Sequence, residues 1–353
     1  MLSLSCQGDM MSVVLQEKAD IKENILFDLD KELLNILLKD RTSNKNIIWA
    51  VDDYKIYGDT FAASDYITVD SITGKNGEVI KPRIQKTADE KVIRIRGKAE
   101  VFTPAWLCNA QNNLVDNDWF KSSDIFNTEI EKDWITNNKK ISFPNNRTWQ
   151  EYVKSTRLEI TCGEAPYLTS RYDAVTGEYI EPQNRIGLLD RKLRIISENI
   201  ANDKEWIDWA KIAVKNIYGF DWQGDNVLLA RENILYAIAE YYEYIYGKNL
   251  SADILKELAE IISWNIWQMD GLKCVIPNSC VEKPKNESGQ LNLFEFEQEK
   301  KEAEQLPIEG IEKWEKQCPG CKNNDINTHT GIYCKIMDWN INRPVKFVSL
   351  LRG

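Results

Sequence analysis

The sequence lacks several features that would assign it to common functional classes. No apolar run approaches the roughly 20 residues that a membrane-spanning helix needs, and residues 1–9 lack the basic-then-apolar order of a signal peptide. The 45 basic residues are outnumbered by 55 acidic ones, which gives a net charge of −10. A free-standing nucleic-acid-binding protein normally has a basic surface, so contact with DNA would need a local patch or a second subunit. We therefore expect a cytoplasmic protein with no membrane contact.

Histidine is also scarce, with only one residue, whereas cysteine occurs eight times. Disulfides are rare in a reducing cytoplasm, so clustered cysteines indicate a metal site and scattered ones indicate core packing. Cys318-Pro319-Gly320-Cys321 is a knuckle, in which a short turn lets two thiolates bind one tetrahedral ion. We predict a structural Zn²⁺ site, and the other interpretation is an incidental Cys-x-x-Cys pair. The favoured ligands are Cys280, Cys318, Cys321 and Cys334, and in the alternative set His329 replaces Cys280.

Strands alternate with helices through the middle of the chain, which predicts an α/β fold with a parallel sheet and crossover helices. We expect helices at 23–39, 104–114, 187–199, 204–216, 225–246 and 252–262, strands at 47–51, 157–160, 217–221, 264–270 and 345–351, and a hairpin at 74–77. Thr103 and Asp225 are expected to cap helices, with Pro104 at the first helical position. The predicted parts are an N-terminal helical and mixed extension (1–95), a core (96–275), a zinc-ribbon-like segment (276–340) with a flexible polar insertion (282–317), and a last strand (341–353) that a partner completes.

The stretch from Arg157 to Leu168 reads RLEITCGEAPYL and predicts a buried strand, a tight loop and the start of a helix. Such loops bind nucleotides and nucleosides, because small residues let the backbone approach the ligand and first-turn N–H groups face it. Two later strand ends carry the acids Asp221 and Asp270. Ligands of open parallel sheets bind beyond the carboxyl ends of the strands, so we expect a nucleoside here. Each acid alone has an equal interpretation as a surface or capping carboxylate.

Four segments in this order resemble the first four motifs of the γ-class N6-adenine DNA methyltransferases of restriction-modification systems: 101–104 with the helix after it, 158–168, 218–221 and 265–272. The resemblance implies a Rossmann-like methyltransferase core with a partial parallel sheet that binds S-adenosylmethionine. By it, Thr103 and Pro104 would flank the methionine moiety and Glu159 with its loop would hold the amino-acid part, while Asp221 would bind the ribose hydroxyls and Asp270 the adenine amine. The implied cofactor-binding residues are Phe102, Thr103, Pro104, Glu159, Thr161, Cys162, Gly163, Pro166, Asp221, Trp222, Asp270 and Gly271. The family usually has a second glycine where this chain has Ala165.

The catalytic motif of that family, Asn or Asp followed by Pro-Pro and an aromatic residue, is absent from the sequence. In the family it orients the target amine and stacks on the flipped base. We therefore expect no catalytic residue here and a chain that is inactive alone: an S-adenosylmethionine-binding subunit of an adenine-specific enzyme. A second methyltransferase subunit with an NPPY-type motif would supply catalysis and the contacts to DNA. The alternatives are a non-catalytic zinc-ribbon interaction protein on a degenerate methyltransferase fold and a subunit of an RNA methyltransferase.

Overall fold

A small parallel sheet lies at the centre of the computed structural model, which describes residues 23–87, 103–144, 146–280 and 318–351. Its strands are β5 (Arg157–Ile160), β6 (Ile217–Asp221) and β7 (Ile266–Gln268), hydrogen-bonded in the order β5-β6-β7. β5 pairs with β6 from Arg157↔Ile217 onward, and β6 pairs with β7 from Gly219↔Ile266 onward. The predicted α/β class with a parallel sheet is confirmed.

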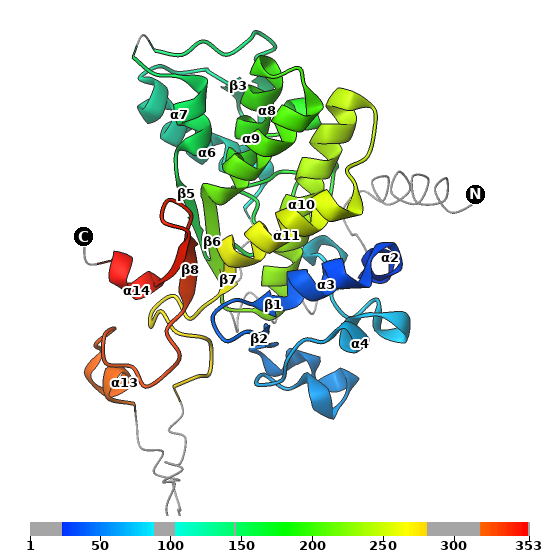
Figure 1. Cartoon of the computed structure of the whole chain (residues 1–353), viewed down its shortest axis with the longest axis vertical. Helices are drawn as coiled ribbons and strands as arrows, with labels where there is room; N and C mark the ends of the chain where they lie inside the picture. Colours follow the sequence, from blue (N-terminus) through cyan, green and yellow to red (C-terminus); the bar gives the residue numbers. More distant parts are fainter. Residues whose placement is uncertain (1–22, 88–102, 145, 281–317, 352–353) are drawn as a thin grey trace, which may run out of the picture.

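Helices connect consecutive strands of the sheet and cover one of its faces (Figure 1). They are α8 (Leu188–Asn199) and α9 (Asp203–Lys215) between β5 and β6, and α10 (Gly224–Tyr246) and α11 (Ala252–Asn265) between β6 and β7. Ile217 and Ile266 are fully buried in the apolar core that these helices share with the sheet. Phe220 and Trp267 belong to a second apolar cluster with the C-terminal residues. Side chains alternate between the two faces of a strand, so the helices cover one face and the C-terminal segment covers the other.

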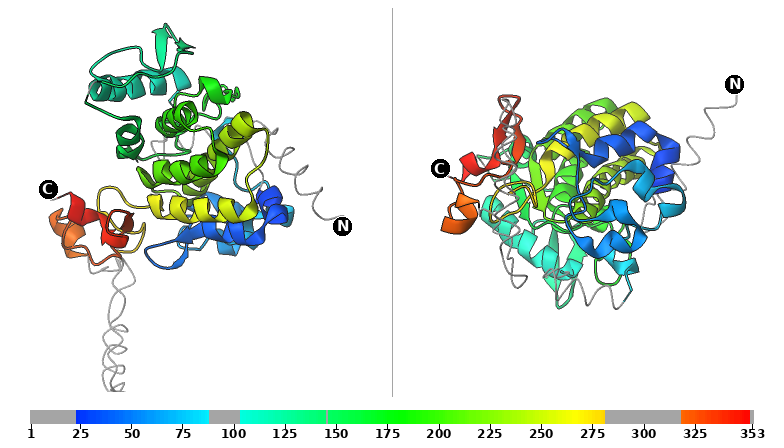
Figure 2. Two further views of the ribbon diagram at one scale, coloured as in Figure 1. Left: turned by 45° about the horizontal axis from the view of Figure 1, so that its top comes forward. Right: turned by 90° about the horizontal axis from the view of Figure 1, so that it is seen from below.

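The N-terminal residues pack on the outer side of these helices, and α3 lies along α11 (Figure 2). The elements are α2 (Glu23–Leu29), α3 (Lys31–Leu38), the two-residue strands β1 (Lys39–Asp40) and β2 (Lys45–Asn46), and α4 (Val69–Ile72). The single helix expected at 23–39 is interrupted because the Asp30 carboxylate accepts the Glu32 N–H at 2.8 Å and caps α3. The expected strand at 47–51 forms only an isolated bridge, Ile48↔Tyr66. The expected hairpin at 74–77 is a 3₁₀ turn, Gly74–Asn76.

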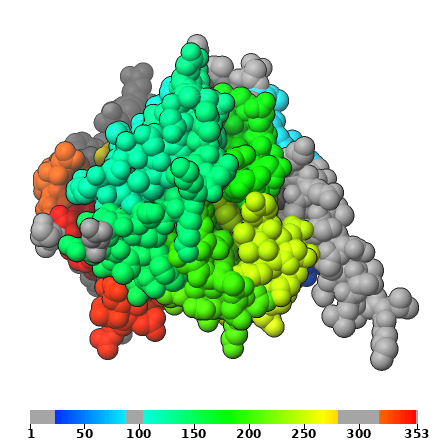
Figure 3. All heavy atoms as spheres, turned by 90° about the horizontal axis from the view of Figure 1, so that it is seen from above, coloured from blue at the N-terminus to red at the C-terminus, as the bar shows by residue number. Residues whose placement is uncertain are grey.

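A polar helix, α6 (Ala105–Phe120), leads into the hairpin of β3 (Asn127–Ile130) and β4 (Asp133–Thr136) and then α7 (Trp149–Lys154). Seen from above, the residues of α6 to α9 form most of the visible surface (Figure 3). α6 continues past the predicted end at Leu114 because its polar side chains are buried and paired. The Arg191 guanidinium donates to the Asp116 carboxylate at 2.6 Å and to Asn109 and Asn113 at 2.9 and 2.7 Å. Helical periodicity of apolar residues therefore gives no signal there.

Both predicted helix caps are wrong in detail. Pro104 is the N-cap of α6, and the Ala105 N–H donates to the Asp173 carboxylate at 2.7 Å instead of to Thr103. Asp225 lies in the first turn of α10, where its carboxylate accepts from the Tyr54 hydroxyl at 2.6 Å. Long-range partners therefore replace the local caps that the sequence suggests.

The C-terminal segment contains α13 (Pro319–Asn323), β8 (Lys335–Asp338), β9 (Arg343–Lys346) and α14 (Phe347–Leu350). The strand expected at 345–351 as a fourth parallel strand is wrong, because β9 pairs antiparallel with β8 and the chain turns into α14. The Phe347 ring fixes this turn by packing on Phe220 and Trp267, with ring centroids 5.9 and 5.2 Å apart.

Among the described residues, no helix combines the length and apolar character needed to cross a membrane.

Candidate functional site

The loop after β5 has an unusual backbone. Thr161, Gly163 and Ala165 have φ angles of 50°, 52° and 63°, in a left-handed region that costs roughly 1–2 kcal/mol for residues other than glycine. The loop turns tightly, and the Ala165 N–H donates to the Cys162 carbonyl at 2.7 Å. Ala165 thus has a backbone conformation that glycine adopts more readily than alanine. Strained backbone of this kind gathers at binding and catalytic sites.

Glu159 lies on β5 directly before this loop and is buried. Its carboxylate accepts hydrogen bonds from the N–H groups of Tyr167 at 3.3 Å and Leu168 at 3.1 Å. Burial raises the pKa of Glu159 to about 8, and the nearby Asp221 adds to the rise, although the two backbone hydrogen bonds oppose it. Burial therefore favours the protonated form of this carboxyl at neutral pH.

Asp221 ends β6 beside the same loop. Its carboxylate accepts from the N–H groups of Gly163 at 3.0 Å and Gln223 at 2.9 Å, and from the Asn226 side chain at 3.3 Å. Burial raises its pKa to about 6, the hydrogen bonds oppose the rise, and the charge of Asp225 adds to it. The bond to Gly163 joins the carboxyl end of β6 to the loop after β5.

The start of α6 reaches the same edge of the sheet. The Tyr167 hydroxyl is hydrogen-bonded to Thr103, and it lies near the Cys108 thiol and the Glu159 carboxyl. The structure thus brings together Thr103, Glu159, the 161–166 loop and Asp221 at one edge of the sheet. Phe102 lies outside the described residues. The predicted role of the loop N–H groups is different, because those of Gly163, Tyr167 and Leu168 donate to the two acids of the protein itself.

Asp270 follows β7, and its neighbour Met269 donates its N–H to the Asp221 carbonyl at 2.9 Å. The Asp270 carboxylate accepts the Leu272 N–H at 3.0 Å and the Lys273 N–H at 3.2 Å, and it forms an ion pair with the Lys273 ammonium at 3.2 Å. Sequence reasoning missed Lys273, although its spacing of three residues from Asp270 is a usable signal. Trp222 donates its indole N–H to the Ala50 carbonyl at 3.2 Å and so contacts the N-terminal part.

Gly271 supports the same corner of the sheet. A Cβ atom at this position would lie 2.8 Å from the Phe220 ring, so only glycine lets the chain pass there without a shift. Gly271 is a predicted cofactor-binding residue, and packing against Phe220 is a separate reason for glycine at this position.

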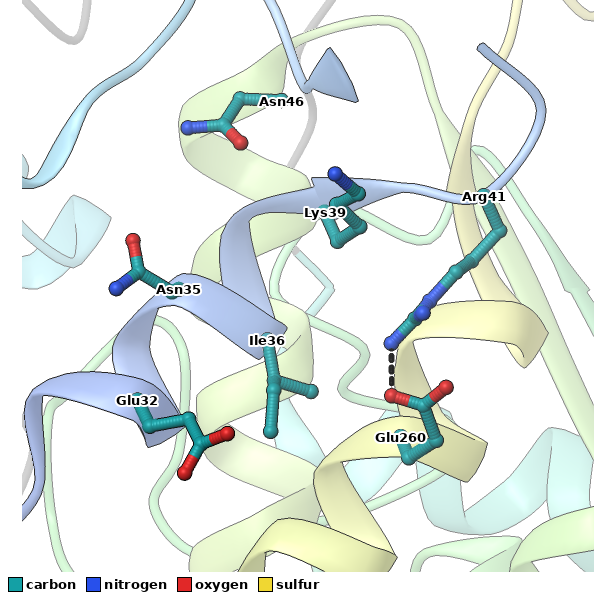
Figure 4. Close-up of a pocket in the computed structure, with 7 residues that line it drawn as sticks. All are labelled: Glu32, Asn35, Ile36, Lys39, Arg41, Asn46 and Glu260. Carbon is teal, nitrogen blue, oxygen red and sulfur yellow. Dashed lines mark hydrogen bonds and ion pairs between the residues drawn. The ribbon is translucent and has the colours of Figure 1, made fainter. Parts of the chain in front are cut away.

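A separate surface depression lies between α3 and α11 (Figure 4). Its floor includes an ion pair between the Arg41 guanidinium and the Glu260 carboxylate, and Arg41 also donates to the Ser263 hydroxyl at 2.8 Å. These contacts join the N-terminal part to α11 and pair two of the charged groups that line the depression. It contains none of the predicted site residues, and its lining is Glu32, Asn35, Ile36, Lys39, Arg41, Asn46 and Glu260.

Four of the five predicted metal ligands form one cluster: Cys280, Cys318, Cys321 and His329. Their ligand atoms all lie within 4.8 Å of one another. The three Sγ atoms, in the same order, are 3.7, 3.5 and 3.6 Å from the His329 Nδ1. This cluster can hold a metal ion, and the donor set of three thiols and one imidazole is one that zinc prefers.

The knuckle is shaped for close approach of these ligands. A Cβ at Gly320 would lie 2.6 Å from the His329 Nδ1, so a larger residue would displace the ring. The Thr330 N–H donates to the Cys318 Sγ at 3.2 Å. The pKa of Cys318 is lowered to about 5, because hydrogen bonds from Thr330, Cys321 and His329 outweigh the effect of burial. A thiolate, the form that binds metal, is thus favoured at this position.

Cys334 is a correction to the predicted ligand set. It is fully buried, its thiol donates to the Gln268 carbonyl at 3.4 Å, and it packs in the cluster that contains Trp267 and Phe347. His329 therefore takes the place of Cys334, whereas the alternative set had it replace Cys280. Cys334 directly precedes β8, and its side chain packs against Phe220 and Trp267 on the parallel sheet, away from the metal cluster.

Comparison with known proteins adds no assignment. No protein-family model matches the sequence, and neither the curated proteins nor the solved structures include a match.

Proposed function

We propose that this chain is the S-adenosylmethionine-binding subunit of an adenine-specific DNA methyltransferase, and that a second subunit completes the enzyme. The observation that carries the proposal is the meeting of Glu159, Asp221 and the strained 161–165 loop at the carboxyl ends of two adjacent parallel strands. Ligands of open parallel sheets bind at this edge. The choice of S-adenosylmethionine as the ligand comes from the resemblance of the sequence motifs to those of the adenine DNA methyltransferases.

The chemistry of the two acids supports a cationic ligand. Both carboxyls are buried, and among the described residues no lysine or arginine forms an ion pair with either. An unpaired buried charge is costly, and this cost appears as the raised pKa values of about 8 and about 6. S-adenosylmethionine carries a sulfonium and an ammonium group. Its ammonium group would supply positive charge beside Glu159 and so favour ionisation of that carboxyl.

The sheet itself supports a second subunit. Doubly wound sheets have the strand order 3-2-1-4-5-6, and the ligand lies at the switch point between strands 1 and 4. β7, β6 and β5 correspond to 3-2-1, and in the described part of the chain β5 pairs with β6 alone. Leu158 and Ile160 on β5 are 44% and 65% exposed. We propose that a strand of the partner pairs with the free edge of β5, and that the partner carries the NPPY-type motif and most contacts to DNA.

For the cysteine cluster we propose a structural Zn²⁺ ion. Tetrahedral zinc with ordinary Zn–S and Zn–N bonds places sulfur and nitrogen ligands about 3.6 Å apart. The three Sγ–Nδ1 distances of 3.5 to 3.7 Å agree with this value. Four protein ligands fill a tetrahedral shell, which is typical of a structural site rather than a catalytic one.

Isothermal titration calorimetry with S-adenosylmethionine tests the ligand. We expect one molecule to bind per chain, and we expect Asp221→Asn to weaken binding at least tenfold. The matched control is Asp59→Asn, which changes an exposed aspartate far along the chain from the strand ends. If neither the chain alone nor its complex with the protein encoded beside it binds, the proposal is wrong. An adjacent gene without an Asn-Pro-Pro-aromatic motif would remove most support for the second subunit.

One observation favours the alternative of a non-catalytic interaction protein on a degenerate methyltransferase fold. The N–H groups that would face a ligand already donate to Glu159 and Asp221, as expected of a site that has closed on itself. The same titration decides between the two, because a degenerate site would not bind S-adenosylmethionine. A subunit of an RNA methyltransferase would bind the cofactor equally, and the substrate of the complete enzyme distinguishes it.

A further inference from the structure

The loop that carries Asp270 connects the strand ends to the metal cluster. This Asp270 loop, residues 270–276, begins two residues after β7, and three residues separate its end from Cys280. Inside it, the Asp270 N–H donates to the Val275 carbonyl at 2.8 Å and the Cys274 N–H donates to the Asp270 carbonyl at 2.7 Å. Leu272 at its tip is 88% exposed. The loop has no regular secondary structure of its own, so its position depends on what lies beside it.

The segment beside it is the one that follows His329. The Ile276 N–H donates to the Ile332 carbonyl at 2.9 Å, and the Cys334 N–H donates to the Cys274 carbonyl at 3.0 Å. The Ile332 N–H donates to the Ser279 hydroxyl at 3.0 Å. These bonds run between the segment leading to Cys280 and the segment leading away from His329, so a metal ion held by both residues would join the two segments beside the loop.

Tyr333 ties the metal ligand itself to the loop. It forms a bridge with Val275, and its hydroxyl accepts the His329 N–H at 3.0 Å and donates to the Ile326 carbonyl at 2.8 Å. The Tyr333 side chain therefore holds the backbone of His329, while the Tyr333 backbone pairs with Val275 in the Asp270 loop.

Lys273 provides an electrostatic connection. Its ammonium is 3.2 Å from the Asp270 carboxylate. Burial lowers the pKa of Lys273, but its hydrogen bond and charge interaction with Asp270, together with the sulfurs of Cys321 and Cys280, raise it overall. The ammonium thus pairs with the acid at the strand end and is within electrostatic range of Cys321 and Cys280.

We propose that metal binding at Cys280, Cys318, Cys321 and His329 fixes the Asp270 loop, and that metal and nucleoside ligand therefore bind with positive coupling. This coupling to a ligand rests on the proposed function, whereas the ordering of the loop does not. Because the unfolded segment does not hold these four ligands together, the free energy of metal binding is also folding free energy for the segment that supplies them. Any coupling between two binding equilibria is reciprocal, so the ligand tightens metal binding by the same factor.

Hydrogen exchange of the full chain, with zinc and after removal of zinc by a chelator, tests the ordering of the loop. We expect the amides of Leu272, Lys273, Cys274 and Ile276 to exchange at least tenfold faster without metal, and the amides of β5 and α10 to be unchanged. Equal exchange in the loop with and without metal overturns the inference whatever the ligand is. Faster exchange throughout the chain also overturns it, because the metal would then stabilise the whole fold and not this loop.

Calorimetry with S-adenosylhomocysteine tests the coupling. We expect removal of zinc to raise the Kd about tenfold, and we expect Lys273→Met to weaken binding severalfold with the metal content unchanged. The control is Lys322→Met, because Lys322 is an exposed lysine next to Cys321 with its side chain outside the loop. The same Kd with and without zinc overturns the coupling. Faster loop exchange without binding of S-adenosylhomocysteine in either state retains the ordering, overturns the coupling and counts against the proposed function.

Discussion

Replacement of Glu159 by glutamine should change how the stability of the protein depends on pH. The folded state holds the Glu159 proton with a pKa of about 8, compared with 4.5 for the ordinary group. This difference corresponds to about 5 kcal/mol. An acid with a raised pKa in the folded state contributes most stability below the unfolded pKa and loses it as pH rises. The loss therefore lies between pH 4.5 and about 8.

The measurement is urea denaturation followed by tryptophan fluorescence at pH 6, 7 and 8. We expect the unfolding free energy of the unaltered protein to fall by roughly 2 kcal/mol from Glu159 alone over this range, and we expect Glu159→Gln to remove that part of the slope. The slope is the quantity compared, because the amide nitrogen of glutamine also replaces one acceptor of the Tyr167 and Leu168 N–H groups. Asp59→Asn is the control for removal of one exposed negative charge.

The same carboxyl makes a prediction for the ligand. The proposed ligand, S-adenosylmethionine, would bind the ionised form of Glu159 more tightly, so its affinity should rise with pH from 6 to 8, by up to tenfold per unit where one proton is released. Glu159→Gln should bind more weakly and with little dependence on pH. Parallel slopes for the two proteins, in both denaturation and binding, would show that Glu159 is already ionised in the fold and would refute the reasoning.

Three further predictions concern the metal, the loop and the free strand. Cys318→Ser should lose bound zinc, whereas Cys334→Ser should keep one zinc per chain, as measured by atomic absorption; loss in both would contradict the ligand assignment. Ala165→Gly should leave the urea midpoint unchanged or raise it, because the φ of 63° is relieved, whereas Ala239→Gly within α10 should destabilise by about 1 kcal/mol. Ile160→Asp should leave the chain folded and abolish its co-purification with the proposed second subunit; retained association would exclude the β5 edge as the binding surface.

The order of strands, helices and strand-end acids could be predicted because each crossover carries its own apolar pattern. β6 occupies the predicted residues, and α8 and α9 begin and end within one residue of the predicted ends. The misses have long-range causes. α6 is long because Arg191 pairs with Asp116 from a distant helix, and the chain enters α14 at Phe347 because two rings of the sheet accept that side chain.

The candidate sites show the same division. Spacing identified the knuckle Cys318 and Cys321, but the choice between Cys334 and His329 depends on which side chain points into the sheet, and local sequence does not contain that information. The glycine-like conformation of Ala165 was likewise hidden, because alanine gives no sign of a positive φ.

The C-terminal segment limits where a partner can bind. It covers Phe220 and Trp267, and its Met337 carbonyl accepts the Tyr218 hydroxyl at 3.2 Å, so this face is closed over β6 and β7. Leu158 and Ile160 pair with Tyr218 and Phe220 and lie on the same face, yet they remain exposed. Helices that follow strand 4 in a doubly wound sheet cover the face opposite to those of the first half. A partner strand beside β5 would therefore bring apolar cover to these two residues and place its own carboxyl end next to Glu159 and the 161–165 loop.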